Sequence, residues 1–210
     1  MKIALINGSP KRKDSASQLI LETIQPLLAS GDDVHFYHLG KPVLTSEEID
    51  QIKQNDILLF ALPLYVDGIP SQLLRCLQQL ETPLAVLGNK QMVYAVVNCG
   101  FYEGHQAQWA IEMMENWCVK AGQTWGQGVG VGGGAMLPSL TNVRLGYGPL
   151  KNLGKAFQQL VDNITRRTTG ESVYIVPNFP KLAYKLAGEM SMRKSIKANG
   201  LRSKDLYLRK

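Results

Sequence analysis

The stretch Asn7–Gln18, NGSPKRKDSASQ, follows directly on the apolar run Ile3–Ile6. A short buried strand that ends in a polar loop and continues into a helix is typical of the first unit of an open α/β sheet, where ligands bind beyond the carboxyl ends of the strands. The helix start offers unpaired backbone N–H groups and a positive dipole end, which suit a phosphate. The loop adds hydroxyl groups and positive charges at Ser9, Ser15, Ser17, Lys11, Arg12 and Lys13.

A plainer interpretation of this loop stays open. Ser15 and Gln18 match the capping box Ser-x-x-Gln, which is typical of a solvated helix start. The loop lacks the glycines of the nucleotide-triphosphate loop, Gly-x4-Gly-Lys-Ser/Thr, and those of the dinucleotide pattern Gly-x-Gly-x-x-Gly. A hydroxyl-rich loop without these glycines favours a lone terminal phosphate.

Beyond this loop, the sequence alternates between two periods as far as residue 168. Short apolar runs lie at 3–6, 34–39, 57–62, 92–97 and 124–131. Helical patterns separate them; Leu19, Ile20 and Ile24, for example, share one helix face. Five strands that alternate with five helices predict a parallel sheet with helices on both faces.

The pattern changes after Gly170, so we expect a main domain at 1–170 and an extension at 171–210. Ser172–Val176 has the composition of a short strand, and a basic helical stretch follows it. The apolar face of that helix, which we expect to pack on the main domain, comprises Leu182, Leu186 and Met190.

The net charge of +6 is unevenly distributed. Residues 163–210 hold eleven Lys or Arg and three acidic residues, which gives +8, whereas residues 1–162 carry −2. This basic tail is consistent with a solvated helix face, with a rim that attracts anionic nicotinamide cofactors, or with a membrane or nucleic-acid patch. The solvated face is favoured because the charges are spaced and form no dense run. We therefore expect no nucleic-acid partner, and no segment that spans a membrane.

Three further features of the sequence indicate where in the cell the protein is located. The longest apolar run, Ile57–Val66, is too short for a spanning helix, which needs ~20 residues. The sequence opens directly on a strand pattern, so no signal peptide is expected. The cysteines are few, odd in number and far apart, which argues against disulfides and predicts a cytoplasmic protein. They are Cys76, Cys99 and Cys118.

Two further loops follow strands three and four. The first is Pro63–Pro70, PLYVDGIP, and the second is Asn98–His105, NCGFYEGH. Both are expected at the same sheet edge as the serine-rich loop. Their aromatic side chains can cover a flat ring, and their glycines allow backbone N–H groups to approach its heteroatoms. Packing of these aromatic residues under the loops is the plainer alternative for each one alone.

The three loops together are similar to those of a known protein family. Residues 3–105, through ALINGSPKRKDSASQLI, LPLYVDGIPSQLL and VVNCGFYEGHQ, resemble the flavodoxin-like NAD(P)H-dependent FMN reductases, including the iron–sulfur flavoproteins. The segment NFPKLAYKLAGEMSMRKSIKANGLRSKDL is similar to a C-terminal piece of one branch. The resemblance implies a flavodoxin-like three-layer sandwich with a five-stranded parallel sheet of order 2-1-3-4-5. It also implies bound FMN, reduction by NAD(P)H, a flavin, quinone, nitro compound or protein as acceptor, and a homodimer.

The resemblance also implies a set of FMN-binding residues. Those of the phosphate loop are Ser9, Lys11, Ser15, Ser17 and Gln18. Those along the isoalloxazine ring are Pro63, Leu64, Tyr65, Val66, Asp67 and Gly68. Those at its pyrimidine edge are Asn98, Cys99, Gly100, Phe101, Tyr102 and, more weakly, His105. The cofactor performs the chemistry, so no catalytic acid or base is named. Residues 40–56 contain no cysteine, so no iron–sulfur cluster is expected. His35 and His38 are three apart in a predicted strand and face opposite sides, so no other metal is expected.

Three competing interpretations are weighed against this one. Gly128-x-Gly130-x-x-Gly133 matches the dinucleotide pattern but lies in and after the fifth strand, without a helix or an acidic ribose partner behind it. A non-enzymatic FMN carrier would be expected to have a strongly acidic surface, which this chain lacks. A hydrolase with Cys99 as nucleophile and His105 as base would be colourless, and only Glu103 is at hand to orient the base.

Overall fold

The computed structural model describes residues 1–11, 13–88, 90–202 and 204–205. The chain divides into two compact units, Met1–Pro177 and Asn178–Lys210. Among the described residues, no helix is both long and apolar enough to cross a membrane.

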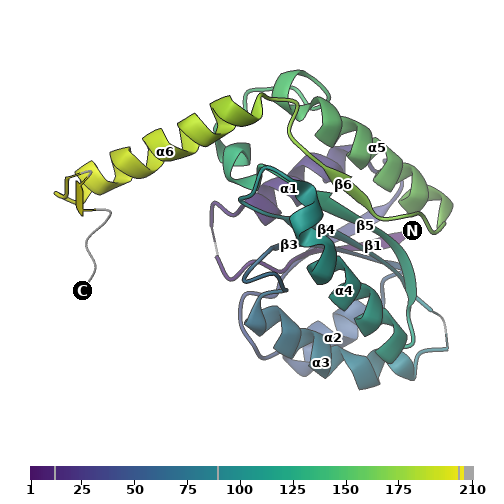
Figure 1. Cartoon of the computed structure of the whole chain (residues 1–210). Coiled ribbons are helices and arrows are strands. Elements are labelled where there is room, and N and C mark those ends of the chain that lie inside the picture. The colour runs from purple at the N-terminus through teal and green to yellow at the C-terminus, as the bar shows by residue number, and fades with distance from the viewer. Residues whose placement is uncertain (12, 89, 203, 206–210) are drawn as a thin grey trace. The chain divides into compact units, whose positions relative to one another are not determined.

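The first unit is built on one parallel sheet of order β2-β1-β3-β4-β5-β6 (Figure 1). Its strands are β1 Lys2–Asn7, β2 Asp33–His38, β3 Ile57–Pro63, β4 Met92–Asn98, β5 Thr124–Val131 and β6 Val173–Ile175. The predicted order of the first five strands is confirmed, but the predicted total of five strands is wrong. The sixth strand pairs with Val129–Val131 of β5. This strand has only three residues, and all of them are half buried. So short an apolar run does not predict a place in the sheet.

Helices cover both faces of this sheet (Figure 1). They are α1 Ala16–Ile24, η1 Gln25–Leu27, α2 Ser46–Lys53, α3 Ser71–Ala85, η2 Gly104–Ala107, α4 Gln108–Lys120, η3 Gly134–Ser139, η4 Gly148–Leu150 and α5 Lys151–Arg166. Successive strand residues point to opposite faces. Ile3, Leu5, Ile57 and Leu59 therefore pack against α1 and α5. Ala4, Ile6, Leu58 and Phe60 pack in the core formed with α2, α3 and α4.

The glycines of β5 have a packing role. A Cβ at Gly126 would overlap the ring of Tyr94, and one at Gly128 would meet Ile111 of α4. Gly130 likewise leaves space for the ring of Tyr174 in β6. These three glycines therefore admit large neighbouring side chains.

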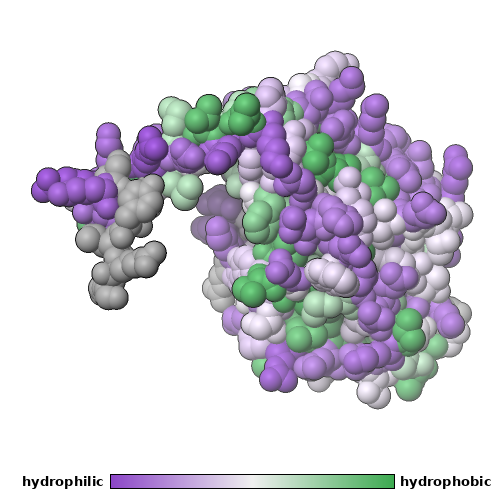
Figure 2. Space-filling view, in the orientation of Figure 1, coloured by the Kyte–Doolittle hydropathy of each residue, from purple (hydrophilic) through white to green (hydrophobic). Residues whose placement is uncertain are grey.

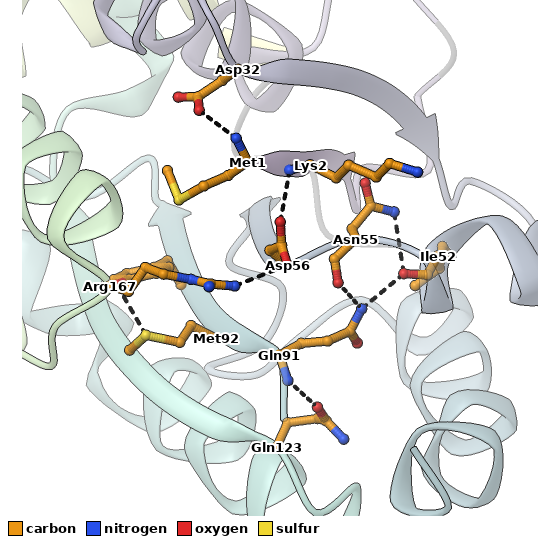
Figure 3. Close-up of polar contacts among 11 residues, drawn as sticks. Met1, Lys2, Asp32, Ile52, Asn55, Asp56, Gln91, Met92, Gln123 and Arg167 are labelled. Carbon is orange, nitrogen blue, oxygen red and sulfur yellow. Dashed lines mark hydrogen bonds and ion pairs between the residues drawn. The ribbon is translucent and has the colours of Figure 1, made fainter. Parts of the chain in front are cut away.

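The amino-terminal edge of the sheet is closed by polar contacts (Figure 3). The Asp56 carboxylate accepts from the backbone N–H of Lys2 at 2.9 Å and pairs with Arg167 at 3.0 Å. The Lys2 hydrogen bond and the Arg167 charge lower the pKa of Asp56. The amino group of Met1 pairs with Asp32 at 2.9 Å. Further bonds join Gln91 to Ile52, Asn55 and Gln123. These contacts occupy the amino-terminal edge, so we expect the ligand-binding loops at the opposite edge, beyond the carboxyl ends of the strands.

The second unit contains α6, Lys181–Ala198. The first half of α6 carries hydrophobic side chains and its second half is mainly hydrophilic (Figure 2). Within this unit α6 buries none of its side chains, and the predicted apolar face of Leu182, Leu186 and Met190 is exposed. That this face packs on the main domain stays a prediction, as does the role of the basic extension.

Candidate functional site

Asn7, the last residue of β1, shapes the serine-rich loop. Its buried side chain accepts from the backbone N–H of Ser9 at 2.9 Å. Its Nδ2 donates to Gln18 Oε1 at 3.1 Å and lies 3.4 Å from Ser15 Oγ. Sequence reasoning missed Asn7 as a site residue. An Asn before Gly at a strand end is a signal for such a bond, because its short side chain bonds the backbone two residues on.

Two side chains from other elements hold the carbonyl groups of this loop. Gln72 of α3 donates to Gly8 O at 3.1 Å, and His38 Nε2 lies 2.8 Å from Ser9 O. Neither side chain was predicted. Both carbonyls therefore already accept a hydrogen bond within the protein.

The hydroxyl oxygens of all three predicted serines accept hydrogen bonds within the protein. Ser9 Oγ accepts from Lys11 N at 3.2 Å, and Ser15 Oγ accepts from Gln18 N at 3.1 Å. Ser17 Oγ accepts from Asn98 Nδ2 at 3.0 Å. Each hydroxyl also has one proton, which it can donate to another acceptor. All three side chains are buried, so the loop fits an anion with several oxygen acceptors, as a phosphate has.

The remaining loop residues are placed differently. The Gln18 side chain bonds Asn7 and donates to Glu22 at 3.0 Å, so its predicted bond back to Ser15 N is replaced and only one half of the capping box forms. Lys11 and Lys13 are exposed. Arg12 lies outside the described residues.

The loop after β3 contains a tight two-residue turn. Tyr65 and Gly68 exchange backbone hydrogen bonds of 3.0 Å in both directions. Val66 and Asp67 between them have φ of 50° and 59°. Two positive φ values define the hairpin turn that usually requires Asn or Gly. A β-branched residue in this region is strained by about 1–3 kcal/mol, and such strain concentrates at ligand-binding sites. The Val66 side chain is fully exposed.

Pro63 ends β3, and the half-buried Leu64 continues it by donating from its backbone N–H to Asn98 O at 2.8 Å. Asn98 in turn bonds Ser17, and Gly8 N donates to Ala61 O of β3 at 2.8 Å. These contacts bring the three predicted loops together at the carboxyl ends of β1, β3 and β4. The strand order reverses there, because β1 lies between β2 and β3.

The loop after β4 presents open space and an aromatic ring. A Cβ at Gly100 would have no described atom beyond its chain neighbours within 4 Å. Phe101 beside it is 56% exposed, and Tyr65 of the neighbouring loop is 42% exposed. The Tyr102 hydroxyl instead donates to Pro177 O at 3.4 Å. The side-chain position of Gly100 is therefore open among the described residues, and the Tyr102 hydroxyl bonds the end of the first unit.

Cys99 and His105 do not form a nucleophile–base pair among the described contacts. Cys99 Sγ lies near the carbonyls of Phe101 and Glu103, at 3.8 and 3.5 Å. The His105 ring instead stacks edge-on against Tyr174 of β6, with 5.1 Å between centroids. Burial raises the pKa of the Cys99 thiol, so the nucleophilic thiolate is disfavoured. This geometry does not support the hydrolase interpretation.

A parallel sheet with a phosphate-suited loop at its reversal point is the architecture of the flavodoxin-like α/β proteins. A sequence model of the NADPH-dependent FMN reductases matches residues 1–121, more than half of the chain. The chain therefore belongs to the NADPH-dependent FMN reductase family. It is a flavin-dependent NAD(P)H oxidoreductase with FMN as cofactor and NAD(P)H as co-substrate.

Solved structures share the fold at low sequence identity. An NADH:FMN oxidoreductase in its apo form has a TM-score of 0.59 and 17% identity, over 81% of this chain and 91% of that chain. An FMN-dependent NADH-azoreductase from Bacillus anthracis, in complex with FMN, has a TM-score of 0.53 and 17% identity, over 78% and 99%. A flavodoxin, a WrbA-like protein from Agrobacterium tumefaciens, has a TM-score of 0.53 and 13% identity, over 80% and 99%. No curated protein sequence matches the chain significantly.

Replacement of Cys99 by Ser tests the role of the thiol. Hydride transfer requires the two cofactor rings to be held close together and needs no protein nucleophile. The Cys99→Ser protein is expected to keep FMN and to retain NAD(P)H-driven flavin reduction within about tenfold, or ~1.4 kcal/mol of barrier. Stopped-flow absorbance without oxygen measures this rate. A variant that binds FMN but is slowed a thousandfold would show that the sulfur takes part in the reaction.

Proposed function

We propose that the phosphate of FMN binds between the serine-rich loop and the start of α1. The observation that carries this assignment is that the buried Ser9, Ser15 and Ser17 hydroxyl oxygens all accept internal hydrogen bonds, so that each hydroxyl can donate its proton to a ligand. The backbone N–H groups of the first turn of α1 add to these donors, because an α-helix leaves its first N–H groups without intrahelical partners. Lys11 contributes positive charge from the rim of the loop.

The isoalloxazine ring is assigned to the space between the other two loops. The segment 63–68 lies along the ring, and residues 98–102 line its pyrimidine edge. The open space at Gly100 and the exposed rings of Tyr65 and Phe101 support this placement. Bound FMN supplies the redox chemistry, by taking a hydride from NAD(P)H and giving electrons to an acceptor. The chain itself binds the cofactor, orients the ring and limits the access of water to it.

The acceptor proposed here is a small flat molecule, such as a flavin, a quinone or a nitro compound, rather than a protein. Trp109 and Met113 of α4 are 60% and 37% exposed, and Met113 Sδ lies beside Gly68 of the ring loop. The exposed rings of Tyr65 and Phe101 add aromatic surface on the neighbouring loops, which suits a flat uncharged ring. Turnover of a quinone, a nitroaromatic and an azo dye, set against a small electron-transfer protein, tests this choice. Faster turnover of the protein would contradict it.

The assembly and the compartment are also proposed. The family resemblance supports a homodimer, which sedimentation equilibrium of the purified protein would detect. The three described cysteines are buried and unpaired, which supports a reducing, cytoplasmic environment.

Replacement of Ser17 by Ala tests the phosphate assignment. Removal of one hydrogen bond to a charged phosphate is expected to weaken FMN binding by ~1.5–3 kcal/mol, about tenfold or more. Riboflavin lacks the phosphate and should bind the variant and the parent protein about equally. Titration of apoprotein with each flavin, followed by fluorescence quenching, measures both affinities. Equal affinity of the parent protein for FMN and riboflavin would exclude a phosphate site in this loop.

A further inference from the structure

Asn98 links the phosphate loop to the two ring loops. It is the last residue of β4 and is only 6% exposed. Its Nδ2 donates to Ser17 Oγ at 3.0 Å and to Leu62 O at 2.9 Å. Its own carbonyl accepts from Leu64 N at 2.8 Å. One side chain therefore contacts the start of α1 and the end of β3 at the same time.

The orientation of this amide is fixed by its surroundings. Leu62 O can only accept, so the atom that faces it must be the Asn98 nitrogen. The second hydrogen of that nitrogen is then directed to Ser17 Oγ. A Cβ at Gly134 would lie 3.2 Å from Asn98 Oδ1, so the glycine leaves space for the amide in this orientation.

The proton of Ser17 is left for a ligand. Ser17 is 1% exposed, and among the described residues its hydroxyl has Asn98 as donor and no bonded acceptor. A buried hydroxyl proton without an acceptor is costly, which points to an acceptor supplied from outside the chain. We propose that Asn98 is a positioning residue for FMN: it occupies a lone pair of Ser17 Oγ and thereby directs the Ser17 proton to the phosphate. This inference rests on the proposed phosphate site.

The direction of this hydrogen bond can be reversed without a change of size. In an Asn98→Asp variant the ionised carboxylate can only accept, so it draws the Ser17 proton toward itself and away from the phosphate. The carboxylate also repels a phosphate directly, whatever side chain stands at position 17. A double-mutant cycle with Ser17→Ala separates the two effects, because direct repulsion is common to both backgrounds and cancels in the comparison.

The quantity to measure is the ratio of the riboflavin and FMN dissociation constants, determined at pH 8 on the full-length apoprotein. This ratio reports phosphate binding and is insensitive to a general loosening of the loops. The Asn98→Asp change is expected to lower the ratio at least about tenfold more in the parent protein than in the Ser17→Ala variant. Equal decreases in both backgrounds, or no decrease in either, would overturn the positioning role.

Asn55 offers a matched control at the opposite edge of the sheet. It is 5% exposed, and its Nδ2 likewise donates two hydrogen bonds, in this case to two carbonyls, Gln51 O at 2.8 Å and Ile52 O at 3.2 Å. The Asn55→Asp change should leave the flavin ratio unaltered even if it lowers the melting temperature. Should Asn98→Asp fail to fold, Asn98→Leu removes the donor without charge, and the same cycle decides the proposal. A parent ratio near one would refute the phosphate site itself, independently of Asn98.

Discussion

A Gly104→Ala variant is expected to lose about 3 kcal/mol of folding stability, because the added methyl group has no space to occupy. Gly104 begins η2, and a Cβ there would overlap the backbone oxygens of Gly130 in β5 and Ile175 in β6. Backbone oxygens cannot rotate away as a flexible side chain can, so at least one of the two strands must shift. For a chain of this size the loss corresponds to a melting temperature lower by about 6–12 °C.

Gly100→Ala provides the control for this prediction, since a Cβ there would meet no described atom beyond its chain neighbours within 4 Å. Its melting temperature should equal that of the parent protein. Thermal unfolding of the two apoproteins, monitored by circular dichroism, makes the comparison. An unchanged melting temperature for Gly104→Ala would mean that the contact between η2 and the last two strands is looser than the structure indicates.

The close contact at Gly104 illustrates what the sequence could predict. The alternation of short apolar runs, such as those of β1 and β3, with helical patterns is a local signal. It predicted the sheet, the helix layers and the edge at which the loops meet. Hydrogen bonds between residues far apart in the chain have no local sequence signal. Gln72 reaches Gly8 across 64 positions, and Asn98 reaches Ser17 across 81. Contacts of this kind arise from the fold and could not be predicted from periodicity or local motifs.

The site residues that were predicted have a local sequence signal, whereas those that were missed depend on contacts between distant parts of the chain. Ser15 was predicted as a helix cap from its spacing to Gln18, and its Oγ does accept from Gln18 N. The other half of the box failed because Asn7, eleven residues away, competes for the Gln18 side chain. His38 was missed because its bond to Ser9 O depends on β2 lying beside β1. In these two cases a tertiary contact decided where a polar side chain bonds.

Gly100→Val is expected to abolish most FMN binding while it leaves the apoprotein folded. Gly100 does not have a positive φ, so a β-branched residue can adopt its backbone conformation without strain. The branched side chain would instead occupy the open space beside Phe101, where the flavin ring is assigned. Overpacking of a close contact costs typically 1–3 kcal/mol, which weakens FMN binding by roughly tenfold to a hundredfold.

Riboflavin separates this effect from a phosphate defect. Because the obstruction lies at the ring, Gly100→Val should weaken FMN and riboflavin by the same factor, whereas Ser17→Ala should weaken FMN alone. Gly100→Ala, with a smaller side chain, should fall between the parent protein and the valine variant. If Gly100→Val kept full affinity for both flavins and an unchanged melting temperature, the ring could not lie against this loop. The open space at Gly100 would then have to belong to the nicotinamide or to the acceptor, and the flavin would have to be placed closer to Tyr65 and Val66.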